Sequence, residues 1–327
     1  MAKTAVIGAG AWGTTLSILL AERGHEVMLW SYEAELIPDL IELRENKKYL
    51  PGFQLPPAIS ATGELKEALS NAQVAIFAVP TQFLSQTIKS SLPYLDPGTI
   101  LVSASKGIEE RSLKLPSVII SELFSGNIAV LSGPNLAKEI ARGLPAATVV
   151  AGKKETCEVI QKILSSERFR VYINDDLIGV QLGGALKNII AIAAGVADGF
   201  ELGDNTKSAL LIRSMAEITR LGVSLGAAEK TFAGLSGMGD LITTCSSNLS
   251  RNHQVGYELA KGKKLAEILA SMKDIAEGVP TCRAVVMLAK QQNVEMPITH
   301  EVYQVLFEGK DPYKAIISLL KRTPTSE

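Results

Sequence analysis

Lys187 is the side chain whose setting in the sequence most suggests chemistry. It lies about midway along a predicted helix, Gln181–Val196, which is apolar on nearly every side and is therefore expected to be buried. Burial disfavours the charged form of an amine, and an amine that exchanges a proton near neutrality suits a general acid or base in alcohol oxidation. A lysine that snorkels to the surface or pairs with a carboxylate is the alternative. Since no histidine is well placed for this work, the pattern favours a catalytic Lys187.

A second lysine, Lys106, follows a predicted strand at Ile100–Ser103. Ligands on open α/β sheets bind beyond the carboxyl ends of strands, so Lys106 is expected at the mouth of such a crevice. An ordinary solvated lysine explains its position equally well.

The turn Gly8–Gly13 has the spacing GxGxxG, with glycines at 8, 10 and 13. It directly follows a predicted strand, Thr4–Ile7, and opens a predicted helix, Thr14–Glu22. In that context the three glycines allow a tight turn, approach of a pyrophosphate and close helix–strand packing, while the helix N-terminus attracts phosphate. The loop therefore predicts a dinucleotide site, with a glycine turn that binds nothing as the alternative.

The choice between NAD and NADP depends on the end of the second predicted strand, Glu26–Trp30. An acidic residue there favours NAD, whereas an arginine receives the 2′-phosphate of NADP. Glu33 lies two or three residues beyond the expected place, and no arginine stands at the tip. Three basic side chains of the following loop could nevertheless approach a 2′-phosphate there, namely Arg44, Lys47 and Lys48. The sequence does not decide between the two coenzymes.

Two polar groups interrupt the apolar second half of the chain. Asp240 ends a glycine-dense turn and is placed to cap a helix, which does not exclude a role as carboxylate partner of Lys187. The triplet Ser250–Asn252 puts a hydroxyl, the Arg251 guanidinium and an amide at the start of another helix, which suits an anion such as phosphate. By itself the triplet is weak evidence for an anion site, because serine and arginine are common at helix starts.

The elements that carry these residues change character near residue 180. Before it, short β-branched runs alternate with helical patterns, as in a parallel sheet covered by helices. We predict a doubly wound Rossmann-type α/β domain over residues 1–180 and an all-helical domain over residues 181–327. Besides those named above, the predicted strands are Val74–Val79, Ile128–Leu131, Thr148–Val150 and Phe169–Ile173, and the predicted helices are Ser208–Leu221, Leu265–Met272 and Arg283–Gln291.

Composition excludes several classes of protein. With 327 residues, of which 46% are hydrophobic, the chain is neither disordered nor fibrous. A net charge of −1 argues against nucleic-acid binding through bulk charge, and three scattered cysteines with three scattered histidines offer no disulfide framework or metal site. The opening MAKTAVIGAG lacks a secretory leader, and apolar runs such as Ile189–Ala197 are too short to span a membrane. We expect a cytoplasmic protein with no bound metal.

Taken together, these motifs resemble the NAD(P)-dependent glycerol-3-phosphate dehydrogenase family. The similar stretches run in order over nearly the whole chain, and the one at 185–213 is far more specific than a GxGxxG alone. They are GAGAWGTTL (8–16), SASKGIE (103–109), LSGPNLAKEI (131–140), ALKNIIAIAAGVADGFELGDNTKSALLIR (185–213), GLSGMGDLITTC (234–245), SRN (250–252) and AEGVPT (276–281).

The resemblance implies reversible hydride transfer between sn-glycerol 3-phosphate and dihydroxyacetone phosphate with NAD or NADP, supplying glycerol phosphate for phospholipid synthesis. It implies Lys187 as proton acceptor and Lys106 as a second catalytic lysine that contacts both ligands. The other implied substrate contacts are Gly133, Pro134, Asn188, Asp240, Thr244, Ser250, Arg251 and Asn252, with Arg251 facing the phosphate. The implied cofactor contacts are Gly8, Gly10, Ala11, Trp12, Gly13, Tyr32, Lys106, Ala137, Arg251, Ile275 and Glu277.

The chain departs from the family pattern at two places. Pro134 stands where a small hydroxyl residue is common, and the Ser31–Tyr32 tip lacks the basic residue of many NADP-preferring members. The nearest rival is a hydroxy-acid dehydrogenase of the hydroxyisobutyrate or 6-phosphogluconate type, which the SRN triplet and the GDNTK stretch (203–207) disfavour. A dinucleotide-sensing regulator without turnover is a second rival, and the resemblance also implies a homodimer.

Overall fold

The computed structural model describes residues 2–272 and 274–323. The chain divides into two compact units, Met1–Lys106 with Lys114–Gln181, and Gly107–Leu113 with Leu182–Glu327. The short segment Gly107–Leu113 therefore groups with the second unit although it lies within the first half of the sequence.

The first unit is built on one sheet with the strand order β10-β9-β8-β7-β6-β1-β2-β5. Neighbouring strands are parallel except β8 and β9, which are antiparallel. The strands are β1 (Lys3–Ile7), β2 (Glu26–Trp30), β5 (Ile59–Thr62), β6 (Val74–Phe77), β7 (Ile100–Ser103), β8 (Ile128–Ser132), β9 (Ala146–Gly152) and β10 (Phe169–Asn174), and a separate ribbon pairs β3 (Glu45–Asn46) with β4 (Leu50–Gln54).

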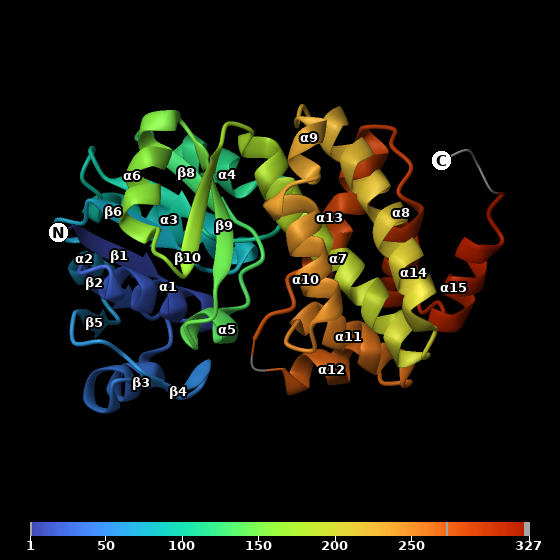
Figure 1. Cartoon of the computed structure of the whole chain (residues 1–327), viewed down its shortest axis with the longest axis horizontal. Coiled ribbons are helices and arrows are strands. Elements are labelled where there is room, and N and C mark those ends of the chain that lie inside the picture. Colours follow the sequence, from blue (N-terminus) through green and yellow to red (C-terminus); the bar gives the residue numbers. More distant parts are fainter. Residues whose placement is uncertain (1, 273, 324–327) are drawn as a thin grey trace. The chain divides into compact units, whose positions relative to one another are not determined.

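Helices cover both faces of this sheet because successive strand residues point to opposite sides. On one face, Val6 packs with α1 and α6, which Figure 1 shows lying in front of the strands. On the other face, Ala5 and Ile7 pack with α2, α3 and α4. The helices are α1 (Ala11–Glu22), α2 (Leu65–Leu69), α3 (Thr81–Ser91), α4 (Pro116–Leu123), α5 (Ala137–Ala141) and α6 (Lys154–Leu164). The predicted doubly wound sheet is confirmed.

Two features of the sheet differ from the prediction. β5 was missed because its sequence, Ile-Ser-Ala-Thr, lacks the continuous apolar run of a central strand, and it lies at the sheet edge beside β2. The antiparallel β8–β9 pair was missed because periodicity reports which face of a strand is buried and not its direction. The strands at Glu26–Trp30 and Ile100–Ser103 have the predicted bounds.

All the regular secondary structure among the described residues of the second unit is helical. Its helices are α8 (Gly203–Ser224), α9 (Glu229–Phe232), α10 (Asp240–Ser246), α11 (Arg251–Ala260), α12 (Leu265–Ser271), α13 (Gly278–Gln291), α14 (Pro297–Phe307) and α15 (Pro312–Leu320), with most of α7 (Leu177–Gly199), and a π-helical turn at Leu235–Gly239 precedes α10. The predicted all-helical second half is confirmed for these residues.

Helix α7 forms the core of this unit. It is long and apolar enough to cross a membrane, but 83% of its most apolar window is buried inside the protein, as in a core helix. It crosses α11 closely at Gly195 and Gly256, because a Cβ added to Gly256 would lie 1.8 Å from the Ile192 carbonyl oxygen. This approach brings Asn252, at the start of α11, against Asn188 in the middle of α7.

Candidate active site

The glycine loop has the geometry that a bound pyrophosphate requires. Gly8 follows β1 with φ +117°, and a Cβ there would lie 2.8 Å from the Ala78 carbonyl oxygen just beyond β6. A Cβ on Gly13 would lie 1.9 Å from the Gly8 carbonyl oxygen, whereas one on Gly10 would meet nothing within 4 Å. The space at Gly10 opens beside the N-terminus of α1, where no side chain caps the helix. These residues fit a dinucleotide, which binds where the strand order reverses between β1 and β6.

Other predicted cofactor residues of the first unit lie near this loop. Ala11 and Trp12 form the first turn of α1, and the hydroxyl of Thr15 donates to the Ala137 carbonyl over 3.3 Å, which fastens the start of α5 to α1. Tyr32, just beyond β2, is 86% exposed, and although its ring lies 6.2 Å from that of Trp30 between centroids, most of its surface is open to a planar ligand.

The basic residues after β2 do not stand ready for a phosphate. Arg44 donates to the carbonyls of Pro56 and Ile59, so its role is structural. Lys47 lies 3.8 Å from Asp39, and Lys48 donates to Glu33 over 2.7 Å. The expectation that these three side chains could meet a 2′-phosphate is wrong for Arg44, because its guanidinium is committed to backbone carbonyls.

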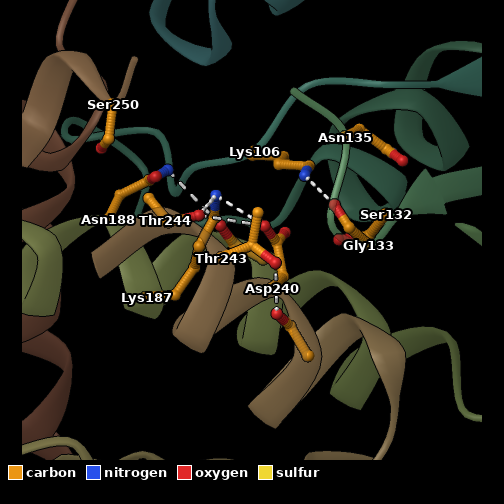
Figure 2. A network of polar contacts seen from close by, with 12 residues as sticks. Lys106, Ser132, Gly133, Asn135, Lys187, Asn188, Asp240, Thr243, Thr244 and Ser250 are labelled. Carbon is orange, nitrogen blue, oxygen red and sulfur yellow. Dashed lines mark hydrogen bonds and ion pairs between the residues drawn. The ribbon is translucent and has the colours of Figure 1, made fainter. Parts of the chain in front are cut away.

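Lys106 is held by the turn after β8. Its Nζ donates to the Gly133 carbonyl over 2.6 Å, as Figure 2 shows, and this bond excludes an ordinary solvated lysine. Thr148 of β9 fastens the same turn, because its hydroxyl donates to the Ser132 carbonyl (2.9 Å) and accepts from Asn135 Nδ2 (3.0 Å). The structure thus joins predicted residues Lys106 and Gly133.

Two polar atoms of that turn are buried without a protein partner. Among the described residues, Ser132 Oγ and Asn135 Oδ1 have no hydrogen bond. Because buried polar atoms in folded proteins nearly always have a partner, such orphans mark a place where a ligand or water completes the bonding. The motif that contains them, LSGPN, pointed to this turn, but neither side chain was predicted as a site residue.

In the second unit, Lys187 is buried and paired with a carboxylate. Its Nζ lies 2.9 Å from Asp240 Oδ1 and donates to Thr244 Oγ1 over 2.6 Å, and the Thr244 hydroxyl donates to the same Asp240 oxygen over 3.1 Å (Figure 2). The exposed fractions of the Lys187 and Asp240 side chains are 8% and 2%. The prediction of a buried Lys187 is confirmed, and the snorkelling alternative is wrong.

The capping role considered for Asp240 is also wrong. Asp240 is the first residue of α10, Gly239 precedes it as cap, and no side chain caps this helix. The π-helical turn continues directly into α10, which leaves the Asp240 carboxylate to accept bonds from Lys187 and Thr244. The carboxylate pairing that was considered as the alternative to a catalytic Lys187 is present, and the catalytic role of Lys187 stays a prediction.

The residues predicted around the SRN triplet form a second group. Asn252 Nδ2 donates to Asn188 Oδ1 over 2.9 Å, and Asn252 Oδ1 accepts from the Gly278 amide over 2.9 Å. Ser250 caps α11 by accepting from the His253 amide. Arg251 is about half exposed and lies 3.6 Å from Asp274. Ile275 is exposed and Glu277 precedes α13 in the segment between α12 and α13.

A network that the sequence did not reveal supports this group. Asp198 at the end of α7 accepts from Lys207 (2.6 Å) and pairs with His253 Nε2 (2.7 Å). Burial alone would raise the pKa of Asp198, but the bonds from Lys207 and His253 outweigh it and hold that pKa below its usual value. The GDNTK stretch contains Lys207, but Asp198 and His253 lie in two other helices.

The geometry defines a class of enzyme: a dehydrogenase with a Rossmann dinucleotide-binding unit and a helical unit that carries a buried lysine–carboxylate pair. No group of three or more metal-ligating side chains occurs among residues 2–272 and 274–323. Models for the N- and C-terminal domains of NAD-dependent glycerol-3-phosphate dehydrogenase match residues 3–158 and 176–317. The chain belongs to this family.

Individual relatives agree with this assignment. Glycerol-3-phosphate dehydrogenases [NAD(P)+] from Moorella thermoacetica and Citrifermentans bemidjiense are 48% and 46% identical to the chain, covering 99% of it and 97% and 98% of their own lengths. The crystal structure of glycerol-3-phosphate dehydrogenase from Coxiella burnetii superposes with a TM-score of 0.95 at 36% identity, covering 98% of this chain and 99% of that one. A D-mandelate dehydrogenase, at 13% identity and a TM-score of 0.58, shares the fold alone.

Proposed function

We propose that this chain interconverts sn-glycerol 3-phosphate and dihydroxyacetone phosphate with NAD or NADP. The observation that carries the proposal is the buried group of Lys187, Asp240 and Thr244, in a chain whose other unit has the dinucleotide loop. Relatives with the printed name glycerol-3-phosphate dehydrogenase [NAD(P)+] span its whole length, which disfavours a hydroxy acid as substrate.

The dinucleotide would be held through its pyrophosphate by Gly10, Ala11 and Trp12, at the N-terminus of α1. Tyr32 would cover the adenine, and Ala137, whose carbonyl accepts from Thr15 of α1, would contact the cofactor. When bound, the nicotinamide accepts or returns the hydride. This chain's side chains must then orient the alcohol and handle its proton.

Lys187 is the proposed proton acceptor. During oxidation its neutral amine takes the proton of the secondary hydroxyl, and during reduction the charged amine donates that proton to the carbonyl oxygen. Asp240 and Thr244 fix the direction of Nζ, and the Asp240 carboxylate stabilises the charged form. We propose that Lys106 acts on the same substrate as a second cation, oriented by the Gly133 carbonyl.

The phosphate of the substrate is proposed to bind Arg251 at the start of α11, where the guanidinium fork and the helix N-terminus both favour an anion. Asn188, Asn252 and Ser250 would contact the rest of the substrate. Binding energy from the phosphate positions the reacting carbon, so substrates without it should turn over poorly. Gly133, Pro134, Ile275 and Glu277 remain predicted contacts.

Comparing two substrates tests this assignment. Arg251→Ala is expected to lower kcat/KM for dihydroxyacetone phosphate by an amount equivalent to about 2–4 kcal/mol of binding energy, the scale of a lost charge-assisted contact. The kcat/KM for free dihydroxyacetone should stay nearly unchanged. The assay is loss of reduced-coenzyme absorbance. An equal loss on both substrates would remove Arg251 from the phosphate site, and no reduction of either substrate by the wild-type chain would refute the proposed activity.

We also propose that the enzyme works in the cytoplasm as a homodimer and supplies glycerol phosphate for phospholipid synthesis. The support for all three is family resemblance, and sedimentation of the purified chain tests the oligomeric state.

A further inference from the structure

Three side chains form a cluster just beyond β2, which we call the β2-tip cluster: Glu33, Lys48 and Tyr49. The Tyr49 hydroxyl donates to Glu33 Oε1 over 2.6 Å, and Lys48 Nζ donates to Oε2 over 2.7 Å. Each carboxylate oxygen has a second lone pair to offer, because an ionised carboxylate accepts about four hydrogen bonds. The Glu33 carboxylate can therefore accept further hydroxyl groups without releasing Lys48.

The cluster is fastened to the glycine loop by one buried side chain. Asn46 Nδ2 donates to the Ala9 carbonyl (2.7 Å) and to Thr14 Oγ1 (2.8 Å), while Asn46 Oδ1 accepts from the Tyr49 amide (3.1 Å). These bonds hold the segment of Lys48 and Tyr49 against the turn that receives the pyrophosphate. In Rossmann sites the ribose of the adenosine lies between that turn and the end of the second strand, which is the side of the sheet where the cluster lies.

The charges of the cluster suit a hydroxyl better than a phosphate. Lys48 faces Glu33 and also lies 3.9 Å from Glu35, so one cation meets two carboxylates. The neighbouring Lys47 lies 3.8 Å from Asp39. A phosphate monoester carries roughly two negative charges at neutral pH, and the partly buried Glu33 carboxylate would repel it, whereas the charge of the more exposed Glu35 is largely screened by solvent.

We propose that Glu33 makes this enzyme select NAD(H) over NADP(H), by accepting the ribose hydroxyls and by holding Lys48 away from a 2′-phosphate. The inference rests on the dinucleotide site proposed above and adds which coenzyme that site takes. The signal lay in the sequence, since Glu33 was placed two or three residues beyond the expected position; its pairing with Lys48 was not visible there.

The test is direct binding of NAD+ and NADP+ to the full chain by titration calorimetry, with no substrate present. The wild-type chain is expected to bind NAD+ more tightly. Glu33→Gln keeps an acceptor for Tyr49 but frees the Lys48 charge, so the affinity for NADP+ relative to NAD+ should rise by about tenfold or more, the scale of one hydrogen bond to a charged group. In the double variant Glu33→Gln, Lys48→Met this gain should disappear.

Glu35→Gln is the matched control, because it removes the same charge from a side chain that is 69% exposed and, at 3.9 Å, lies farther from Lys48 than Glu33 does. Its affinity ratio should change less than about twofold, as expected for a screened surface charge. An unchanged ratio in Glu33→Gln, or a wild-type chain that binds NADP+ more tightly, would overturn the proposal while leaving the dehydrogenase assignment intact. Absence of binding for both nucleotides would instead refute the proposed function.

Discussion

Replacing Asp240 by asparagine tests whether Lys187 and Asp240 form a desolvated pair. The change preserves the shape of the side chain and an oxygen that can accept a bond from Lys187, but it removes the only negative charge of the Lys187–Thr244–Asp240 group. Both charged side chains are at least nine-tenths buried. Breaking a buried pair by removing one partner costs about 3–5 kcal/mol, and the retained acceptor places this variant near 3 kcal/mol.

For a unit of roughly 150 residues, each kcal/mol lowers the melting temperature by about 2–4 °C, so a fall of about 6–12 °C is expected. The assay is thermal unfolding followed by circular dichroism, with turnover of dihydroxyacetone phosphate measured on the folded protein at 25 °C. Turnover should fall as well, because the charged amine loses the anion that stabilises it.

Asp204→Asn is the matched control, since it makes the same chemical change at an exposed position in the first turn of α8. Its melting temperature should stay within about 2 °C of the wild type, because surface changes are usually within ±0.5 kcal/mol. If Asp240→Asn melted like this control, the idea that Lys187 depends on a buried anion would be refuted.

Two further predictions concern the supports of the site. Thr148→Val should raise KM for dihydroxyacetone phosphate several-fold and cost about 1–3 kcal/mol of stability, because the turn that anchors Lys106 through the Gly133 carbonyl loses its bonds to the Thr148 hydroxyl. Thr148→Ser keeps the hydroxyl and should have the KM and stability of the wild type. A normal KM in Thr148→Val would contradict the anchoring role. Because the pKa of Asp198 is lowered in the folded state, its bonds to Lys207 and His253 stabilise the fold fully at pH values above the pKa of an unfolded aspartate. This stabilisation is lost as the pH falls through the lower pKa of the folded state. The melting difference between wild type and Asp198→Asn should therefore be widest at neutral pH and close below about pH 4, and a difference independent of pH would show that this carboxylate is not stabilised by its partners.

Much of the fold was predictable because local patterns determine it. Continuous apolar runs such as Val74–Phe77 mark central strands, and the apolar surface of α7 marks a core helix with Lys187 as its exception. Asp240 was correctly singled out, but its capping role was misjudged, because a helix start in sequence does not show that the preceding turn is itself helical. Edge strand β5 had too weak a pattern to predict.

The supporting contacts could not be predicted, since each joins residues far apart in the sequence. Asn46 reaches the glycine loop 37 residues away, and Thr148 fastens a turn that begins 16 residues before it. Lys207 and His253 meet at Asp198 from two different helices. Nothing in residue type or spacing distinguishes such side chains from ordinary surface asparagine, threonine or histidine.

Proton transfer by Lys187 is the claim on which the proposed function depends most. The direct measurement is turnover of dihydroxyacetone phosphate by Lys187→Met, with NADH binding followed by the fluorescence of Trp12 and Trp30, which are the two tryptophans of the chain and both lie in the dinucleotide unit. Lys290→Met, at an exposed position of α13, is the control for removing a lysine.

Turnover by Lys187→Met should fall about 10²–10⁴-fold, the usual contribution of a positioned acid or base, while its dissociation constant for NADH stays within about twofold of the wild type. The control should keep wild-type turnover. A Lys187→Met enzyme that binds NADH normally and reduces dihydroxyacetone phosphate at nearly the wild-type rate would contradict the role assigned to this lysine.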